Sequence, residues 1–260
     1  MLFLTFFFIA ITTTIIVLYL IERYKLSRNA NNAKKQYRSY RLLIEDRVSF
    51  YKRLDATNKN RFLTEVSAFL SSVKIEGVGT NVDDLDRILV ASSAIIPIFS
   101  FQGWRYPNLT NVILYPDAFD KHFQFEGTHH NTLGLIGTGY MNGQMLLSKK
   151  ALHSGFSTFS KNSNTAIHEF VHLIDKSDGS VDGVPEHLLE NVYVIPWIKL
   201  MHREMQAIAK GNSEIDSYAL TNEAEFFAVA SEYFFENPDR LNKKHPALFE
   251  MLTKIFKTTS

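Results

Sequence analysis

The pentapeptide His168-Glu169-Phe170-Val171-His172 restricts what this chain can fold into more than any other segment. Histidines four residues apart lie on one face of an α-helix, so both imidazoles can reach one ion, with Glu169 beside the remaining coordination position. The flanking pairs Ala166-Ile167 and Phe170-Val171 are apolar, which favours a buried helix over a chance pair on an exposed one. Because a buried Glu between two buried His needs a partner, the motif predicts a metal site.

Composition narrows the choice of metal and ligands. The chain has 260 residues and no cysteine, which excludes a disulfide scaffold, a thiolate zinc site, an iron–sulfur cluster and a cysteine nucleophile. A metal must therefore be held by His, Asp or Glu. One Zn²⁺ ion suits such ligands, and a catalytic zinc site keeps one position open for water.

A third ligand is needed, and the segment 218–235 offers two candidates. It is strongly apolar, yet it carries Glu225 and Glu232 seven residues apart on one helical face. Glu225 also fits a capping box in which Asn222 is the N-cap, with no metal involved. Glu232 could instead hold a ligating histidine through that residue's outer nitrogen. Spacing alone leaves these alternatives open, together with the remaining acids and histidines.

The other residues give weaker signals. His129 and His130 are adjacent in a loop, where neighbours seldom point at one ion, and four isolated histidines are interpreted as surface or satisfied core groups: His153, His187, His202 and His245. No G-x-S-x-G sequence supports a serine hydrolase. The basic residues of the body are scattered and its charge balance is acidic, which argues against a nucleic-acid partner.

The N-terminal segment predicts a membrane anchor over residues 1–21. Leu2 to Ile21 carries no charge, and twenty helical residues span about 30 Å, the thickness of a bilayer core. The alternative, a cleaved signal peptide, requires a positive residue before a shorter apolar run, and no Lys or Arg precedes this one.

Charge is divided unevenly along the chain. Through Arg53 there are ten basic and three acidic side chains, a formal charge of +7, and the remainder carries −6. Because the positive charge follows the apolar span, the positive-inside rule predicts that the C-terminal part of the chain lies in the cytoplasm. The expected protein is a single-pass protein of the bacterial inner membrane. Residues 22–41 form a basic juxtamembrane linker that can contact anionic lipid headgroups, although a merely solvated linker fits the same residues.

Residues 42–260 read as one globular domain. Apolar spacing predicts two helices between Phe50 and Leu70, separated by a turn and cap at Asp55-Ala56-Thr57, and a further helix over 83–98. Short strands are expected at Val112–Tyr115 and Gln144–Ser148, and helices dominate toward the C-terminus. Four glycines between the strands are interpreted as one loop: Gly134, Gly137, Gly139 and Gly143.

Several separate stretches, in the same order, resemble the zinc-dependent peptidases related to Mlc titration factor A. The matching stretches are Phe50–Leu54, Tyr106–Leu109, Tyr115–Phe119, His168–Asp175 with Gly179 and Asp182–Pro185, and Tyr218 with Glu225–Val229 and Ser231-Glu232. The resemblance extends from Leu42 to about Phe256. It implies a fold similar to the catalytic domain of anthrax lethal factor: an α+β, helix-rich zincin-type metallopeptidase domain with a small sheet.

The resemblance also implies a ligand set. In that family the third ligand is the Glu seven residues after a Tyr, which here is Glu225 after Tyr218. Two departures are visible. Glu223 stands where relatives often have Pro at the first helical position, which affects the rigidity of the helix start more than the ligand. The stretch 137–140 lacks a Trp found in relatives, so substrate preference is expected to differ.

These observations predict a membrane-anchored zinc metallopeptidase acting on peptides or proteins, by exo- or endopeptidase cleavage. Glu169 is the expected general base for the zinc-bound water, and Tyr218 the expected donor to the developing oxyanion. Asp175, one turn beyond His172, could orient a ligand from behind, cap a carbonyl or face water. The strand around Leu146-Leu147 is a candidate edge for pairing with a peptide.

Two other functions fit the same sequence. The first is a regulatory interaction protein that sequesters a transcriptional repressor or another partner at the membrane, as the family's namesake binds Mlc. The second is a zinc hydrolase whose substrate is not a peptide. The complete His-Glu-x-x-His motif with Tyr218 and Glu225 favours an enzyme over a pure binder, which has no need of these residues.

Overall fold

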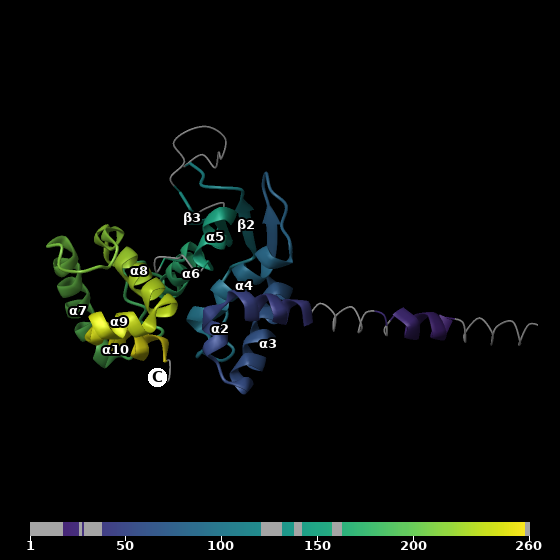
Figure 1. Ribbon diagram of the computed structural model, residues 1–260, viewed down its shortest axis with the longest axis horizontal. Helices are drawn as coiled ribbons and strands as arrows, with labels where there is room; N and C mark the ends of the chain where they lie inside the picture. The colour runs from purple at the N-terminus through teal and green to yellow at the C-terminus, as the bar shows by residue number, and fades with distance from the viewer. Residues whose placement is uncertain are drawn as a thin grey trace, which may run out of the picture. The chain divides into compact units, whose positions relative to one another are not determined.

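The computed structural model describes residues 18–25, 28, 38–120, 132–137, 142–157 and 163–257 (Figure 1). The chain divides into two units, Met1–Leu43 and Ile44–Ser260. Within the described residues, no helix combines the length and the apolarity that crossing a membrane requires. The predicted anchor lies outside the described residues except for its last four, which are helical and exposed. The anchor therefore stays a prediction.

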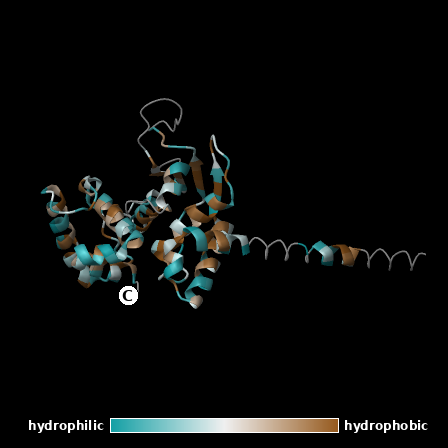
Figure 2. Ribbon diagram, viewed as in Figure 1, coloured by the Kyte–Doolittle hydropathy of each residue, from teal (hydrophilic) through white to brown (hydrophobic). Residues whose placement is uncertain are grey.

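The second unit is rich in helix, as predicted. Its helices are α2 (Ser49–Arg53), α3 (Ala56–Ser72), α4 (Asp84–Ile98), α5 (Lys149–Gly155), α6 (Thr165–Asp175), α7 (Asn191–Ala209), α8 (Glu223–Glu236), α9 (Pro238–Lys244) and α10 (Pro246–Phe256), with 3-10 turns η2 (Lys176–Asp178) and η3 (Ser217–Leu220). Brown and teal residues alternate along these helices in Figure 2, as expected of amphipathic helices that cover a core. Asp55 caps α3 by accepting a hydrogen bond from the Asn58 N–H, which confirms the predicted turn and cap.

A small sheet of four strands lies beside the helices. The strands are β1 (Lys74–Gly77), β2 (Asn111–Tyr115), β3 (Gly134–Ile136) and β4 (Gln144–Ser148), in the order β1-β2-β4-β3. The first three strands of this order run parallel, and β3 is antiparallel to β4. The helix-rich α+β class and both predicted strands are confirmed.

Two details of the sheet differ from the sequence prediction. β4 is hydrogen-bonded to β2 on one side and β3 on the other, so the prediction that Leu146 and Leu147 form an exposed edge is wrong. The edge strand is β3. Gly134 lies in this strand and not in the predicted loop, because pairing with β4 overrides the weak strand propensity of glycine.

The register of the sheet determines which face meets the helices. Gly134 pairs with Leu147, and a Cβ atom built on Gly134 would lie 2.5 Å from Oε1 of Glu169 on α6. The face that carries Gly134 and Leu147 therefore packs against α6. The opposite face carries a separate apolar cluster that includes Phe119 and Leu146.

A buried carboxylate joins α4 to α5. Asp86 is fully buried, and it accepts hydrogen bonds from the Asp83 N–H and from Lys149 Nζ, both at 2.8 Å. Its other oxygen lies 2.6 Å from His153 Nε2. Burial alone raises the pKa of Asp86, but the bonds from His153 and Lys149 outweigh it and lower that pKa to about 2. Ionised Asp86 therefore stabilises the fold.

We expect Asp86→Asn to lower the free energy of unfolding at pH 7 by roughly 1–2 kcal/mol, allowing for solvent screening of its partners. Because the folded pKa lies below the unfolded value of 3.8, this contribution is present above about pH 4 and fades as the pH falls toward about 2. Urea titrations at several pH values measure it. Asp117→Asn, which removes the exposed partner of Lys150, should leave stability nearly unchanged, and a pH-independent Asp86 effect would contradict the assignment.

Candidate metal centre

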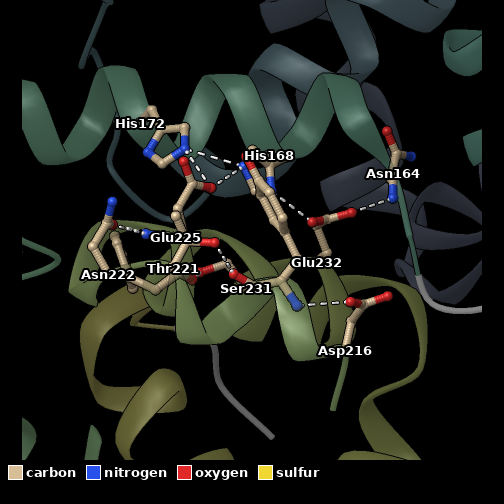
Figure 3. A network of polar contacts seen from close by, with 11 residues as sticks. Asn164, His168, His172, Asp216, Thr221, Asn222, Glu225, Ser231 and Glu232 are labelled. Carbon is tan, nitrogen blue, oxygen red and sulfur yellow. Dashed lines mark hydrogen bonds and ion pairs between the residues drawn. The ribbon is translucent and has the colours of Figure 1, made fainter. Parts of the chain in front are cut away.

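Two helices supply the donor groups of this centre. Asn164 is the N-cap of α6 and its side chain accepts a hydrogen bond from the Ile167 N–H, and His168 and His172 follow about one turn apart on one face of the helix. Asn222 is the N-cap of α8, and its side chain accepts a hydrogen bond from the Glu225 N–H at 2.9 Å. Glu225 thus takes part in the predicted cap through its backbone while its carboxylate faces both histidines (Figure 3). The capping and ligand interpretations are compatible.

The three side chains converge on one point. The Nε2 atoms of His168 and His172 are 3.1 Å apart, and Oε2 of Glu225 lies 2.9 Å from the first and 3.3 Å from the second. Ligand atoms about 2.0–2.1 Å from one ion, at tetrahedral angles, lie about 3.3–3.4 Å from one another. His168, His172 and Glu225 are therefore placed to bind one metal ion.

The electrostatics of the cluster also fit a cation. Burial lowers the pKa of His168, but hydrogen bonds to Glu225 and Glu232 outweigh it and raise that pKa to about 10. Burial raises the pKa of Glu225, but His168 and His172 lower it to about 2. Without a metal, protonated His168 supplies the positive charge beside the carboxylate of Glu225. A bound metal ion would supply that charge in its place. Imidazole and carboxylate donors suit zinc.

Glu169 and Tyr218 lie beside these donors. Glu169 is buried, and burial raises its pKa although His168 and His172 counteract it. Tyr218 is half exposed on η3, with its ring centroid 6.0 Å from that of His168. Its pKa is raised, first by desolvation and then by the charge of Glu225. The structure therefore brings all five predicted site residues into one neighbourhood.

Glu232 and Asp175 occupy positions that spacing could not decide. Glu232 lies against the other nitrogen of His168, with Oε1 2.7 Å from Nδ1. Asp175 is fully buried and accepts a hydrogen bond from the Gly183 N–H at 2.9 Å, so the alternative in which it faces water is wrong. Burial is the largest cause that raises the pKa of Asp175 to about 6.

Residues outside the motif complete the neighbourhood. The sequence prediction placed Gly134 in a loop and gave it no part in the site, but its missing side chain leaves room for Glu169. It did not name Asn164, although an Asn before a helical segment is a common N-cap signal. Three of the isolated histidines pair with carboxylates away from the centre: His153 with Asp86, His202 with Glu223, and His245 with Glu204 and Glu214. His129 and His130 lie outside the described residues.

The family model described as glucose-regulated metallo-peptidase M90 matches residues 22–257 of this chain. The chain belongs to this family. It is 26% identical over 228 residues to an uncharacterized protein of Synechocystis sp., covering 84% of this chain and 82% of that protein. It is 25% identical over 217 residues to Mlc titration factor A of Salmonella arizonae (78% and 85%) and 28% identical over 190 residues to that of Pectobacterium atrosepticum (67% and 69%). The family resemblance seen in the sequence is confirmed, and a metallo-peptidase family implies a metal.

We expect Glu225→Ala to lower the zinc content of the purified protein from about one ion per chain to well below one, because two imidazoles alone hold the ion weakly. Elemental analysis after dialysis measures this content. Glu223→Ala is the matched control, since Glu223 lies two residues earlier on α8 and pairs with His202 at the surface. Full zinc content in the Glu225 variant would show that another acid is the ligand.

Proposed function

We propose that this protein is a zinc metallopeptidase in which His168, His172 and Glu225 hold the metal. The observation that carries the proposal is the convergence of these donors at a point beside the buried carboxylate of Glu169. When bound, zinc acts as a Lewis acid that polarises a peptide carbonyl and acidifies water. The remaining steps belong to side chains of this chain.

Glu169 is the proposed general base. Its burial raises its pKa, which makes the carboxylate a better proton acceptor at neutral pH. It takes a proton from the attacking water and returns it to the leaving amine. Tyr218, whose ring centroid lies 6.0 Å from that of His168, carries a hydroxyl that donates a hydrogen bond to the oxyanion as charge develops there. Tyr218 is half exposed, so a substrate can approach this residue from the solvent.

The edge of β3 is the proposed binding site for the substrate backbone. Within the described residues, β3 pairs only with β4, and no described strand pairs with its outer side. A peptide that adds to this edge as a further strand is held by main-chain hydrogen bonds. Gly134 places the strand directly against Glu169, which brings the added backbone close to the general base. Exposed Leu133 and Leu135 supply apolar contacts there.

We expect Glu169→Gln to bind zinc as the parent does and to cleave peptides about 10²–10⁴-fold more slowly, because the amide cannot accept the proton. A peptide-library digest with parallel zinc analysis measures both properties. Gly134→Ala should also reduce cleavage without loss of zinc, since its Cβ would displace the Glu169 side chain. Parental cleavage rates in the Glu169→Gln protein would disprove the mechanism.

A regulatory interaction is the second candidate function. It is favoured by the relatives named Mlc titration factor A, a name that describes titration of Mlc. In this alternative the chain sequesters a repressor or another protein partner. Capture of such a partner by both the parent and Glu169→Gln, together with no detectable peptidase activity in the parent, would favour this function over the peptidase.

We also propose that the enzyme is a single-pass membrane protein with its catalytic domain facing the cytoplasm. The uncharged run over residues 1–21 and the basic residues that follow it support this topology. We expect the full-length chain to stay with bacterial inner membranes through an alkaline wash and to be digested by protease only after the cells are opened. Recovery of the unprocessed chain in the soluble fraction would contradict the topology.

A further inference from the structure

We propose that Glu232 is the positioning residue of the metal centre: its single carboxylate fixes both the imidazole of His168 and the start of α6. The inference rests on the metal site proposed above and extends it to a residue of α8 that touches neither metal nor substrate. Its basis is a pair of hydrogen bonds that use the two oxygens of Glu232 separately.

The two bonds connect different parts of α6. Oε1 of Glu232 lies 2.7 Å from Nδ1 of His168, and Oε2 accepts a hydrogen bond from the backbone N–H of Asn164 at 2.5 Å (Figure 3). Glu232 is only 5% exposed, so water contributes little to satisfying it. Both donors therefore determine where the carboxylate lies, and the carboxylate in turn determines where they lie.

The bond to His168 sets the chemical state of the ring. An ionised carboxylate can only accept, so Nδ1 must carry the hydrogen in this bond. Nε2, which is hydrogen-bonded to Glu225 in the metal-free protein, is then the nitrogen left to bind a metal once its own proton is released. A carboxylate behind a ligating histidine fixes the tautomer and the ring orientation and increases the basicity of the ligand.

The bond to Asn164 sets the position of the helix that carries the ring. A helix N-terminus has unpaired N–H groups and a partial positive charge, which favour an anion at that place. Asn164 already caps α6 with its own side chain, and Glu232 satisfies its backbone N–H. The start of α6 and the ring four residues later are thus held by one group on α8, so the ring cannot shift relative to its helix.

His172 provides a contrast within the same centre. Its Nδ1 atom is buried and has no hydrogen-bond partner within the described residues. His172 is contacted by a carboxylate only at Nε2, by Glu225, whereas His168 is held by carboxylates at both ring nitrogens. Removal of Glu232 is therefore expected to affect one ligand through its orientation and to leave the other two ligands in place.

The test is Glu232→Gln in the full-length protein. An amide has one acceptor oxygen, and its NH₂ group would face a donor, so at least one of the two bonds is lost. We expect the dissociation constant for Zn²⁺ to rise about 10–100-fold, measured by competition with a chromogenic chelator. The visible spectrum of the Co²⁺-substituted protein should also change, which a purely structural role for Glu232 would not cause.

Two variants serve as matched controls. Glu236→Gln removes a carboxylate one turn later on α8 that accepts from the Asn164 side chain at 3.0 Å but forms no described bond to His168. Asn164→Ala removes the side-chain cap and keeps the backbone N–H that Glu232 accepts from. Both should keep the zinc dissociation constant within about threefold of the parent.

Distinct outcomes separate this inference from the proposed function. Unchanged zinc affinity and an unchanged cobalt spectrum in Glu232→Gln would overturn it, as would equal losses in Glu232→Gln and Glu236→Gln, which would indicate charge alone. If Glu232→Gln does not fold, Glu232→Asp keeps the charge on a shorter side chain, and parental zinc affinity in a folded Asp variant would equally overturn it.

A parent that binds zinc but cleaves no peptide would disprove the peptidase and leave the inference standing. A parent that binds no zinc would overturn both.

Discussion

The pairing of α6 with α8 is the contact on which the rest of the structure depends. Across it, two histidines of α6 face two carboxylates of α8, and all four side chains are largely removed from water. Burying such groups is costly unless each has a partner, so the polar contacts restrict how the helices can slide or rotate. The two helices also bury apolar side chains against other elements, Phe170 on Phe69 and Tyr106, and Phe226 on Trp197, and such burial contributes most of the favourable free energy.

Other elements are arranged around this pair in ways that serve the site. The sheet brings Gly134 against Glu169, where any side chain would collide with the carboxylate. The loop after α6 is held from two sides, because Asp175 accepts from the Gly183 N–H and Trp197 Nε1 donates to the Gly183 carbonyl at 2.7 Å. Gly183 has a φ of +75°, and a Cβ there would lie 2.3 Å from a backbone oxygen of Glu223. Glycine is thus required where this loop meets the start of α8.

The helix caps could be predicted from the sequence because their hydrogen bonds join residues that are close together in the chain. Asp55 and Asn222 act as caps because an Asx side chain before a helix binds N–H groups within three residues of it. β4 was recognisable from its apolar run. The position of β4 inside the sheet could not be predicted, because the residues of an interior strand resemble those of an edge strand when the partner strands are unknown. β3 was missed for a related reason: a three-residue strand that begins with glycine forms only because β4 supplies its hydrogen bonds.

The sequence by itself determined that His168 and His172 share a helical face with Glu169 between them, since that follows from the pitch of one helix. It also determined that Glu225 and Glu232 share a face, about 10.5 Å apart along theirs. Only the tertiary structure decided which carboxylate meets Nε2 and which meets Nδ1 of His168. The reason is physical: spacing within a helix is set by its own backbone, whereas the side chain reached across an interface depends on how two helices pack, and residues far apart in the chain determine that packing.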